Sequence, residues 1–265
     1  MPGEYRLLPV PMFNDNYLWL WVSPDGQALA VDVGDYALLA SVLQSRSWRL
    51  TTVFVTHRHA DHTAGLAELA ARHPEAVIYG PGEIGGVTHP VCGGEMLQPE
   101  SFGEWRVLAV PGHTNEHLAF YHPGQQVLFC GDTLFSMGCG RVFDGDPEAL
   151  FRSLELIYAL PDNTRICCAH EYTLANLDFA LAIEPGNTSL REYRTIIESG
   201  INQGIPSLPA LLELEKRLNP YLRTHDPAFR RVLRNLLPEM PGTPSASEAF
   251  VALRRFKDTW KPAIR

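Results

Sequence analysis

The 265-residue sequence has no apolar run long enough to cross a bilayer, and its opening, MPGEYRLLPV, shows no basic stretch followed by an apolar one. These absences predict a protein without a membrane span and without a signal peptide. Cysteine is scarce, with five scattered residues, an odd number that argues against a disulfide framework and for a reducing compartment. We therefore expect a cytoplasmic protein without a membrane partner.

Positive charge is also in short supply, because 22 lysines and arginines face 30 aspartates and glutamates. Proteins that grip nucleic acids usually carry a basic surface, so the sequence predicts no nucleic-acid partner. The hydrophobic content of 45% is typical of a globular chain and argues against disorder. Residues 219–265 depart from the acidic balance with nine basic and four acidic residues. This segment is either a solvated helical face or a receptor for a small anion.

The chain changes character near residue 172. Before it, short apolar runs alternate with turn signals and helical patterns, which predicts an α/β arrangement. Several of these runs are almost continuously apolar, as in strands covered on both faces. After it, five segments carry helical periods, and the last opens with Ser245 and Glu248 in the spacing of a capping box. We predict two domains, residues 1–172 and residues 173–265.

Three histidines and one aspartate lie within the six residues 57–62, directly after the β-rich run TTVFV. His57 and His59 occupy alternating positions at the end of a strand and can point to one site. The following turn brings Asp61 and His62 to an adjacent site. Imidazole suits zinc and iron, and a carboxylate can bridge two ions. Structural zinc sites favour closed sets that often include cysteine, so this set indicates an open, catalytic centre.

Two ions need more ligands, and three later apolar runs end in residues that can supply them. LAVPGHT delivers His113, LFCGDT delivers Asp132 and ICCAHEY delivers His170. Each of these residues alone is weak evidence, because an isolated histidine is more often a surface or core residue than a ligand. Their shared position just past a strand, where a rigid scaffold holds loops, favours a common site.

The motifs THRHADH, PGHT, GDTLF and CAHEYT, in this order, resemble the metallo-β-lactamase fold superfamily. Within it, GDTLFSMGCGRVFDGD, HEYTLANLDFA, LNPYLR and RRFKD resemble the hydroxyacylglutathione hydrolase (glyoxalase II) family over nearly the whole chain. The resemblance implies an αββα sandwich followed by a C-terminal α-helical domain. We expect the protein to act as a monomer.

The resemblance also implies a dinuclear centre with two divalent ions, usually zinc and sometimes iron or manganese. Its ligands would be His57, His59 and His113 for the first ion, Asp61, His62 and His170 for the second, and Asp132 between them. The implied reaction, part of methylglyoxal detoxification, hydrolyses S-(R)-lactoylglutathione to D-lactate and glutathione by attack of a metal-bridging hydroxide. By the same resemblance, Asp61 and Asp132 would be its catalytic carboxylates. Metal coordination lowers the pKa of water from 15.7 toward about 7, and the ions stabilise the developing oxyanion.

A glutathione thioester is an anion, so the basic segment 219–265 could bind it. On a helix, Arg254 and Lys257 lie one turn apart on the same face. The resemblance places both on the glutathione part of the substrate and adds Arg141 and Tyr172. Position 143 is phenylalanine, where some relatives have a tyrosine that contacts the peptide. Phe143 can pack against the ligand but cannot donate that hydrogen bond.

Three further residues near the motifs receive supporting roles. We interpret Cys139 as a packing residue rather than a nucleophile, and Asp32 as a hydrogen-bond partner of the metal ligands. His117 fits either such a partner or a plain structural residue. The rival functions are another enzyme on the same scaffold, such as a lactonase, a persulfide dioxygenase or a phosphodiesterase, and a metal-binding sensor without turnover.

Overall fold

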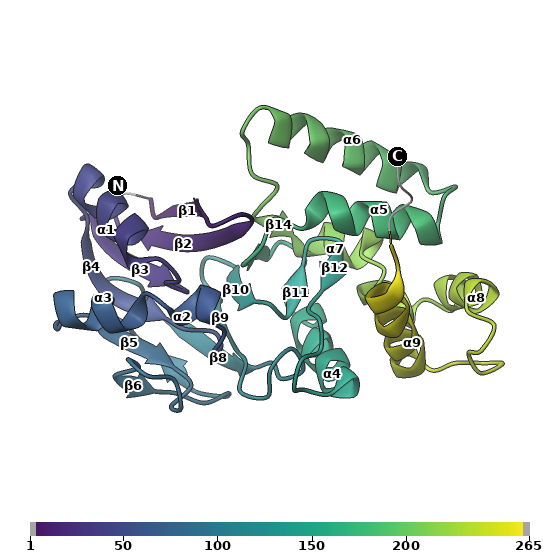
Figure 1. Cartoon of the computed structure of the whole chain (residues 1–265), viewed down its shortest axis with the longest axis horizontal. Coiled ribbons are helices and arrows are strands. Elements are labelled where there is room, and N and C mark those ends of the chain that lie inside the picture. The colour runs from purple at the N-terminus through teal and green to yellow at the C-terminus, as the bar shows by residue number, and fades with distance from the viewer. Residues whose placement is uncertain (1–3, 262–265) are drawn as a thin grey trace. The chain divides into compact units, whose positions relative to one another are not determined.

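The computed structural model describes residues 4–261 and divides the chain into two compact units (Figure 1). The first unit holds the chain up to Val110, together with Glu116–Gly131 and Cys167–His170. The second holds Pro111–Asn115, Asp132–Ile166 and the chain from Glu171 onward. None of the helices in the described range combines the length and the apolar character that crossing a bilayer requires.

A six-stranded sheet in the first unit carries the loop that was predicted to bind metal. Its strands follow one another in chain order, antiparallel from the first to the third and parallel from the third to the sixth. Parallel neighbours need crossover connections, and helices supply two of them. The strands are β1 (Arg6–Met12), β2 (Asn16–Val22), β3 (Gln27–Val31), β4 (Arg49–Phe54), β5 (Val77–Gly80) and β6 (His89–Pro90).

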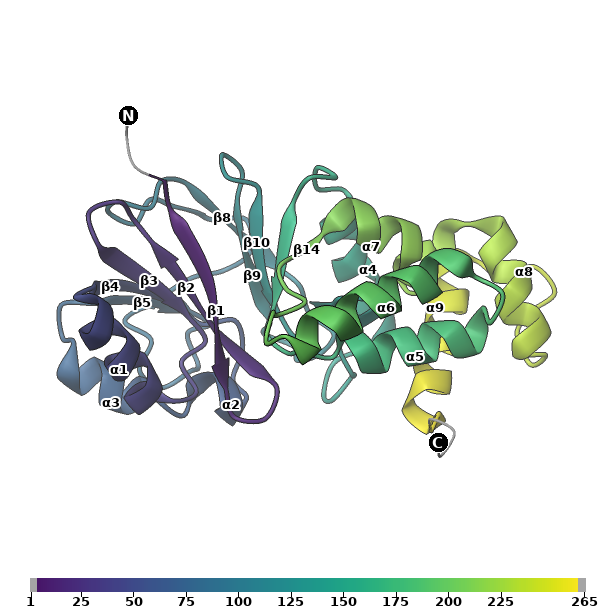
Figure 2. The ribbon, with the colours of Figure 1, turned by 90° about the horizontal axis from the view of Figure 1, so that it is seen from above.

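Helices α1 (Tyr36–Arg46) and α3 (Leu66–Arg72) lie side by side against one face of this sheet (Figures 1 and 2). Leu39 of α1 and Leu69 of α3 are fully buried in one apolar cluster with the strand residues Leu20 and Val53. Asp35 caps α1 by accepting a hydrogen bond from the backbone of residue 38, which fixes where the helix begins.

The other face of the sheet packs through aromatic rings against a second sheet. Phe54 stacks on Phe120 with ring centroids 4.2 Å apart and meets the edge of Trp105 at 5.2 Å. Such pairs contribute stability beyond their buried area and make this the rigid centre of the unit. The strands of the second sheet in this unit are β7 (Met96–Leu97), β8 (Trp105–Ala109), β9 (Leu118–His122), β10 (Val127–Gly131) and the end of β13 (Arg165–Cys168). In this sheet β7, β8, β9 and β10 pair antiparallel.

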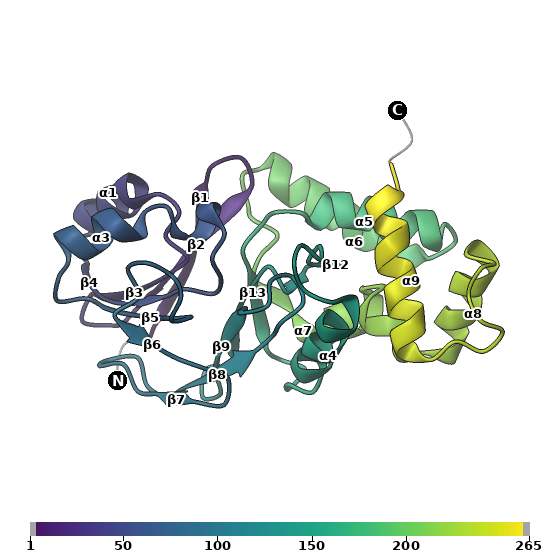
Figure 3. The same cartoon turned by 60° about the horizontal axis from the view of Figure 1, so that its bottom comes forward.

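The second unit is mainly helical, with a short hairpin of β11 (Leu134–Phe135) and β12 (Gly138–Cys139). Helices α5 and α6 run side by side, and α4 lies beside α9 (Figures 2 and 3). The predicted capping box of Ser245 and Glu248 is present at the start of α9. The helices are α4 (Pro147–Tyr158), α5 (Thr173–Ile183), α6 (Thr188–Asn202), α7 (Leu212–Leu218), α8 (Pro227–Leu236) and α9 (Ala246–Thr259), with a 3-10 turn η1 (Leu222–His225).

Two features of the second unit go beyond the sequence analysis. Strand signals were expected to stop after residue 173, yet β14 (Ala210–Leu211) pairs antiparallel with Arg165 and Ile166. Two residues at the start of a helical pattern are too short to show a strand period. In addition, residues 132–166 pack with the helices, for example through Phe151 of α4 and Phe250 of α9, whose ring centroids are 5.6 Å apart.

Replacing Phe120 by alanine should lower the free energy of unfolding by about 3–5 kcal/mol, because the variant leaves a cavity between the two sheets. Urea denaturation followed by tryptophan fluorescence measures the change. Ile196→Ala is the control, because Ile196 is 66% exposed and its loss should cost less than about 0.5 kcal/mol. Equal midpoints for Phe120→Ala and the wild type would contradict the aromatic core described above.

Candidate metal centre

Three of the predicted ligands meet in the first unit. Asp61 and His62 lie on the short helix α2 (Ala60–Thr63), which follows the loop after β4. His170 follows β13 and is held by an isolated bridge to Asn16. Each of the three residues offers one ligand atom, and these atoms all lie within 4.8 Å of one another. One carboxylate and two imidazoles at this spacing fit a divalent metal ion.

The neighbours of the Asp61 carboxylate favour its ionised form. The Nε2 atoms of His170 and His62 lie 3.5 Å and 3.4 Å from Asp61 Oδ2, and the Asn16 amide donates a hydrogen bond to the same oxygen at 2.9 Å. The close approach of His170 and His62 holds the pKa of Asp61 far below its usual range. An anionic oxygen is the form that a metal ligand needs.

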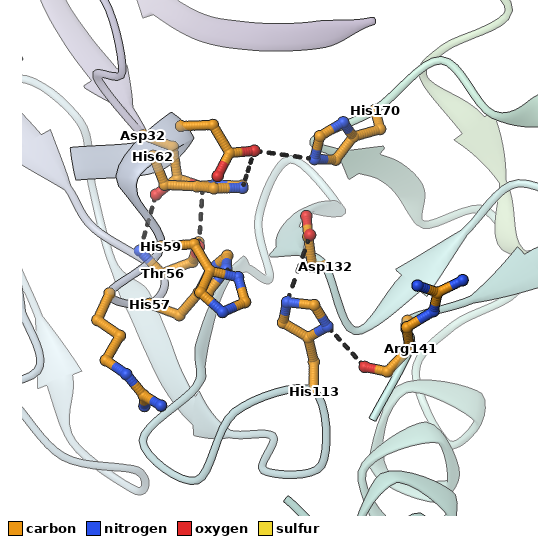
Figure 4. A network of polar contacts seen from close by, with 12 residues as sticks. Asp32, Thr56, His57, His59, His62, His113, Asp132, Arg141 and His170 are labelled. Atoms are coloured by element: carbon orange, nitrogen blue, oxygen red, sulfur yellow. Dashed lines mark hydrogen bonds and ion pairs between the residues drawn. The ribbon is translucent and has the colours of Figure 1, made fainter. Parts of the chain in front are cut away.

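Asp32 fixes the orientation of His62, as the sequence analysis predicted. Its Oδ2 atom accepts hydrogen bonds from His62 Nδ1 at 3.0 Å and from the Thr56 hydroxyl at 2.8 Å, while Oδ1 accepts from the Thr56 amide at 2.8 Å (Figure 4). Asp32 has a left-handed backbone (φ 58°), which aspartate and asparagine tolerate better than most residues. A proton on Nδ1 leaves Nε2 of His62 as the nitrogen for a metal.

The same arrangement recurs at other histidines of the first unit. The Nδ1 atom of His170 lies 2.8 Å from the Asp15 carboxylate, and that of His57 lies 3.0 Å from the Thr56 hydroxyl. Because the Thr56 hydroxyl donates its own hydrogen bond to Asp32, it accepts one from His57 Nδ1. Asp15 and Thr56 were not predicted, because nothing in the sequence links either residue to a particular imidazole.

His57 and His59 form a close pair, with His57 Nε2 and His59 Nδ1 3.0 Å apart. The His117 ring stacks on the His57 ring at 4.6 Å, so His117 packs directly against a predicted ligand. Gly131 permits this approach. A side chain there would begin 2.5 Å from the Thr56 hydroxyl and 2.8 Å from the His117 ring. The chain therefore needs glycine at position 131, which also has a positive φ of 48°.

His113 and Asp132 meet in the second unit, with His113 Nε2 and Asp132 Oδ2 3.5 Å apart (Figure 4). The Nδ1 atom of His113 donates to the backbone carbonyl of Arg141 at 2.7 Å, which again leaves Nε2 for a metal. Gly140 packs against the Asp132 backbone so closely that a Cβ atom would lie 2.0 Å from its carbonyl oxygen. The backbone of this segment therefore positions both predicted ligands.

All five predicted glutathione contacts lie in the second unit. Arg254 is only 5% exposed, and its guanidinium donates to the Cys139 and Gly140 carbonyls at 3.2 Å and 3.4 Å and to Asp258 at 2.9 Å. Arg141 is exposed and lies 3.8 Å from the same Asp258 carboxylate. The two arginines are thus linked through one acid, an arrangement that the helical spacing alone did not predict.

The remaining three contacts offer one cation and two rings. Lys257 lies over the rings of Phe179 and Trp260 at 4.5 Å and 4.8 Å. Burial, together with the nearby charge of Arg254, lowers the pKa of Lys257 to about 8. Phe143 is 61% exposed and packs edge-on against His113, while the Tyr172 ring meets Phe135.

Cys139 has the properties of a packing residue, as expected. It is buried, and burial raises the pKa of its thiol to about 11, so a nucleophilic thiolate is disfavoured at neutral pH. No disulfide bond joins any two of the five cysteines, all of which lie in the described range. A hydrolytic site here must use another nucleophile.

Comparison with known protein families gives two successive matches along the chain. Residues 16–91 and 93–170 match the model of the Metallo-beta-lactamase superfamily, and residues 171–260 match the model called Hydroxyacylglutathione hydrolase C-terminus. A hydroxyacylglutathione hydrolase of Photobacterium profundum is 42% identical over 95% of this chain and 98% of its own. Another, from Thiobacillus denitrificans, is 44% identical over 96% and 98%.

Solved structures share the fold. ETHE1 from Myxococcus xanthus superposes with a TM-score of 0.63 over 95% of this chain and 98% of its own, at 23% identity. TTHA1623 in a di-iron-bound form superposes with a TM-score of 0.54 over 62% of this chain and 91% of its own, at 28% identity. The predicted α/β sandwich with C-terminal helices is confirmed by these matches and by the two sheets.

Replacing Asp32 by asparagine should weaken zinc binding by about 10–100-fold, because the amide no longer offers both oxygens to His62 and Thr56. Asparagine tolerates the left-handed backbone, so the change tests the hydrogen bonds and not the fold. Competition with a chromophoric chelator measures the affinity. The control is Asp35→Asn, three residues along, where asparagine caps α1 equally well and zinc affinity should not change. Equal affinities in the two variants would remove Asp32 from the centre.

Proposed function

Because the chain belongs to the hydroxyacylglutathione hydrolase family of the metallo-β-lactamase superfamily, we propose that it hydrolyses S-(R)-lactoylglutathione to D-lactate and glutathione. The main observation in support is that Nδ1 of four predicted ligands makes a hydrogen bond, which leaves Nε2 available for a metal. The four are His57, His62, His113 and His170. A scaffold or sensor could use such a centre, but the match to the family's C-terminal model favours an enzyme.

We propose that two divalent ions occupy the centre and that zinc is the usual metal. The first would be held by His57, His59 and His113, the second by Asp61, His62 and His170, with Asp132 shared. The donor set supports this assignment, because imidazole and carboxylate suit such ions and no cysteine belongs to the set. TTHA1623, which has the same fold, holds two irons in its di-iron-bound form. When bound, such ions lower the pKa of coordinated water and polarise a carbonyl.

The protein's own groups would prepare this chemistry in two ways. Asp15, Asp32 and Thr56 accept hydrogen bonds from imidazole Nδ1 atoms, so each ring is held in one tautomer before substrate arrives. Asp61 and Asp132 contribute carboxylates, and Asp61 is kept ionised by its neighbours. Preorganised groups need no rearrangement during the reaction, which is the main source of electrostatic catalysis.

The second unit would bind the glutathione part of the substrate through Arg141, Phe143, Tyr172, Arg254 and Lys257. Arg141 is exposed and Lys257 is partly exposed, whereas Arg254 is buried, donates to backbone carbonyls and contributes its charge from below the surface. Phe143 presents an apolar ring in place of a hydroxyl. We propose that recognition is therefore mainly electrostatic.

We further propose that residues 1–172 and residues 173–265 are the two domains, the first supplying the metal ligands and the second Arg254 and Lys257. The expected working form is a cytoplasmic monomer, with no nucleic acid and no membrane involved. The acidic charge balance and the scarcity of cysteine support this proposal.

The purified protein should hydrolyse S-lactoylglutathione, lose the activity on treatment with a chelator and regain it with zinc. His59→Ala should bind less zinc and lower kcat by at least about tenfold. His89→Ala, which changes an exposed histidine outside the centre, should behave as wild type. Loss of thioester absorbance, together with metal analysis, measures both effects. Oxygen uptake with a glutathione persulfide, without thioester hydrolysis, would favour the dioxygenase instead.

Lys257→Ala should raise KM for the thioester by about tenfold with little change in kcat, because uniform binding is lost. In the wild type, the lysine is a cation below its pKa of about 8 and loses its charge above it. KM should therefore rise as the pH passes 8, and the variant should lack this component. Arg255→Ala, an exposed cation on the same helix, serves as the control. A KM that is level in all three proteins would exclude Lys257 from the binding site.

A further inference from the structure

The segment from Asp132 to Arg141 carries three groups of the proposed site within the second unit. It supplies the Asp132 carboxylate, the exposed Arg141 guanidinium, and the Arg141 carbonyl that accepts a hydrogen bond from His113 Nδ1. The segment folds as the β11–β12 hairpin, whose ends are joined by a hydrogen bond from the Gly140 amide to the Thr133 carbonyl. A shift of the hairpin would therefore displace all three groups together.

The tip of this hairpin is held by one carboxylate of α7. Glu215 accepts hydrogen bonds from the Ser136 hydroxyl and from the Met137 amide, both at 2.8 Å. It also accepts from the Asn219 amide at 2.9 Å, and none of its surface is exposed. Burial raises the pKa of Glu215 to about 7, although the bonds from residues 136, 137 and 219 favour its charge.

Two buried asparagine side chains also hold the tip of the hairpin by hydrogen bonds. Asn219 donates to the Phe135 and Gly138 carbonyls at 3.2 Å and 3.0 Å, and Asn176 donates to the Ser136 carbonyl at 3.1 Å. The tip needs such partners, because Met137 has a positive φ of 57°, which costs free energy for a residue with a side chain. The surroundings thus determine the conformation of the hairpin.

A carboxylate suits this position better than an amide or an apolar group. Three donors point at Glu215, and only an acceptor-only side chain satisfies all of them. A buried ionised group is a poor device for stability, since well-packed apolar residues often serve as well or better. Its value lies in fixing one arrangement of the backbone that it holds.

We propose that Glu215 is a positioning residue for the hydrolase: it holds the β11–β12 hairpin so that Asp132 and the Arg141 carbonyl keep the geometry of the metal centre. The proposal rests on the function proposed above. Glu215 is hydrogen-bonded to residues 136, 137 and 219, none of which is a predicted metal ligand or substrate contact, so it would act through the hairpin backbone.

The test compares Glu215→Gln with Glu213→Gln, an exposed glutamate on the same helix. Glutamine keeps the size of the side chain but places an NH2 group toward a donor. We expect Glu215→Gln to weaken zinc binding by about 10–100-fold and to lower kcat by at least about tenfold, while Glu213→Gln matches wild type. Chelator competition gives the affinity, and the absorption spectrum of the cobalt-substituted protein reports ligand geometry without turnover.

A purely structural role would change the denaturation midpoint alone and leave zinc affinity, cobalt spectrum and kcat of the folded protein as in wild type, which would overturn the proposal. Should Glu215→Gln fail to fold, Ser136→Ala removes only one of the three bonds, and the same measurements should then change by a smaller factor, about threefold to tenfold. Unaltered values in Ser136→Ala would then reject the proposal.

The readouts also separate this proposal from the proposed function. Wild-type protein that binds zinc but does not cleave the thioester contradicts the function, and the zinc affinities of the variants still test the role of Glu215. If Glu215→Gln cleaves the thioester at the wild-type rate and binds zinc with the wild-type affinity, the positioning role is contradicted and the proposed function is not.

Discussion

Hydrogen bonds at imidazole Nδ1 are the constraint on which the proposed metal centre depends. A neutral histidine has one nitrogen that donates and one that accepts, and a metal can take only the second. Asp15, Asp32, Thr56 and the Arg141 carbonyl each settle that choice for one ring. The acids among them also make the bound ring more basic, so the same contact sets both the direction and the strength of a ligand.

This constraint explains why the site needs a large, rigid scaffold. Three of the groups that accept from Nδ1 lie just before β2, just after β3 and just after β4, so these strands must be in place for the rings to be oriented. Stacked aromatic rings between the sheets, such as Phe54 on Phe120, supply the stiffness. In the second unit, buried polar groups of α5 and α7 do the comparable work for the hairpin after Asp132.

The candidate ligand residues could be identified from the sequence because their types cluster and because each follows an apolar run. His57, His59, Asp61 and His62 stand within six residues, and the motifs around His113, Asp132 and His170 are specific. Their supporting partners could not be predicted in the same way. Asp15 and Thr56 acquire their roles only when distant strands pair, and the Arg141 partner is a backbone carbonyl that any residue would provide.

Helix α9 shows the same limit of prediction from sequence. Spacing correctly predicted that Arg254 and Lys257 share one face of a helix, but it could not tell a buried cation from a surface one. That difference depends on the Cys139 and Gly140 carbonyls, which the guanidinium reaches across the fold of the second unit. Likewise, β14 is a strand only because β13 offers it an edge.

The two glycines that flank the Asp132 hairpin have a consequence for how such a protein can be altered. At position 131 a methyl group would collide with the Thr56 hydroxyl, and at position 140 it would collide with a backbone carbonyl. Neither of these atoms belongs to the end of a long, flexible side chain that could move away. Almost any substitution of Gly131 or Gly140 should therefore be destabilising. Laboratory evolution toward new thioesters would find its accessible changes on the outer surface of α9 and around Phe143, and selection acting on substrate choice can proceed while the hydrolytic apparatus stays untouched.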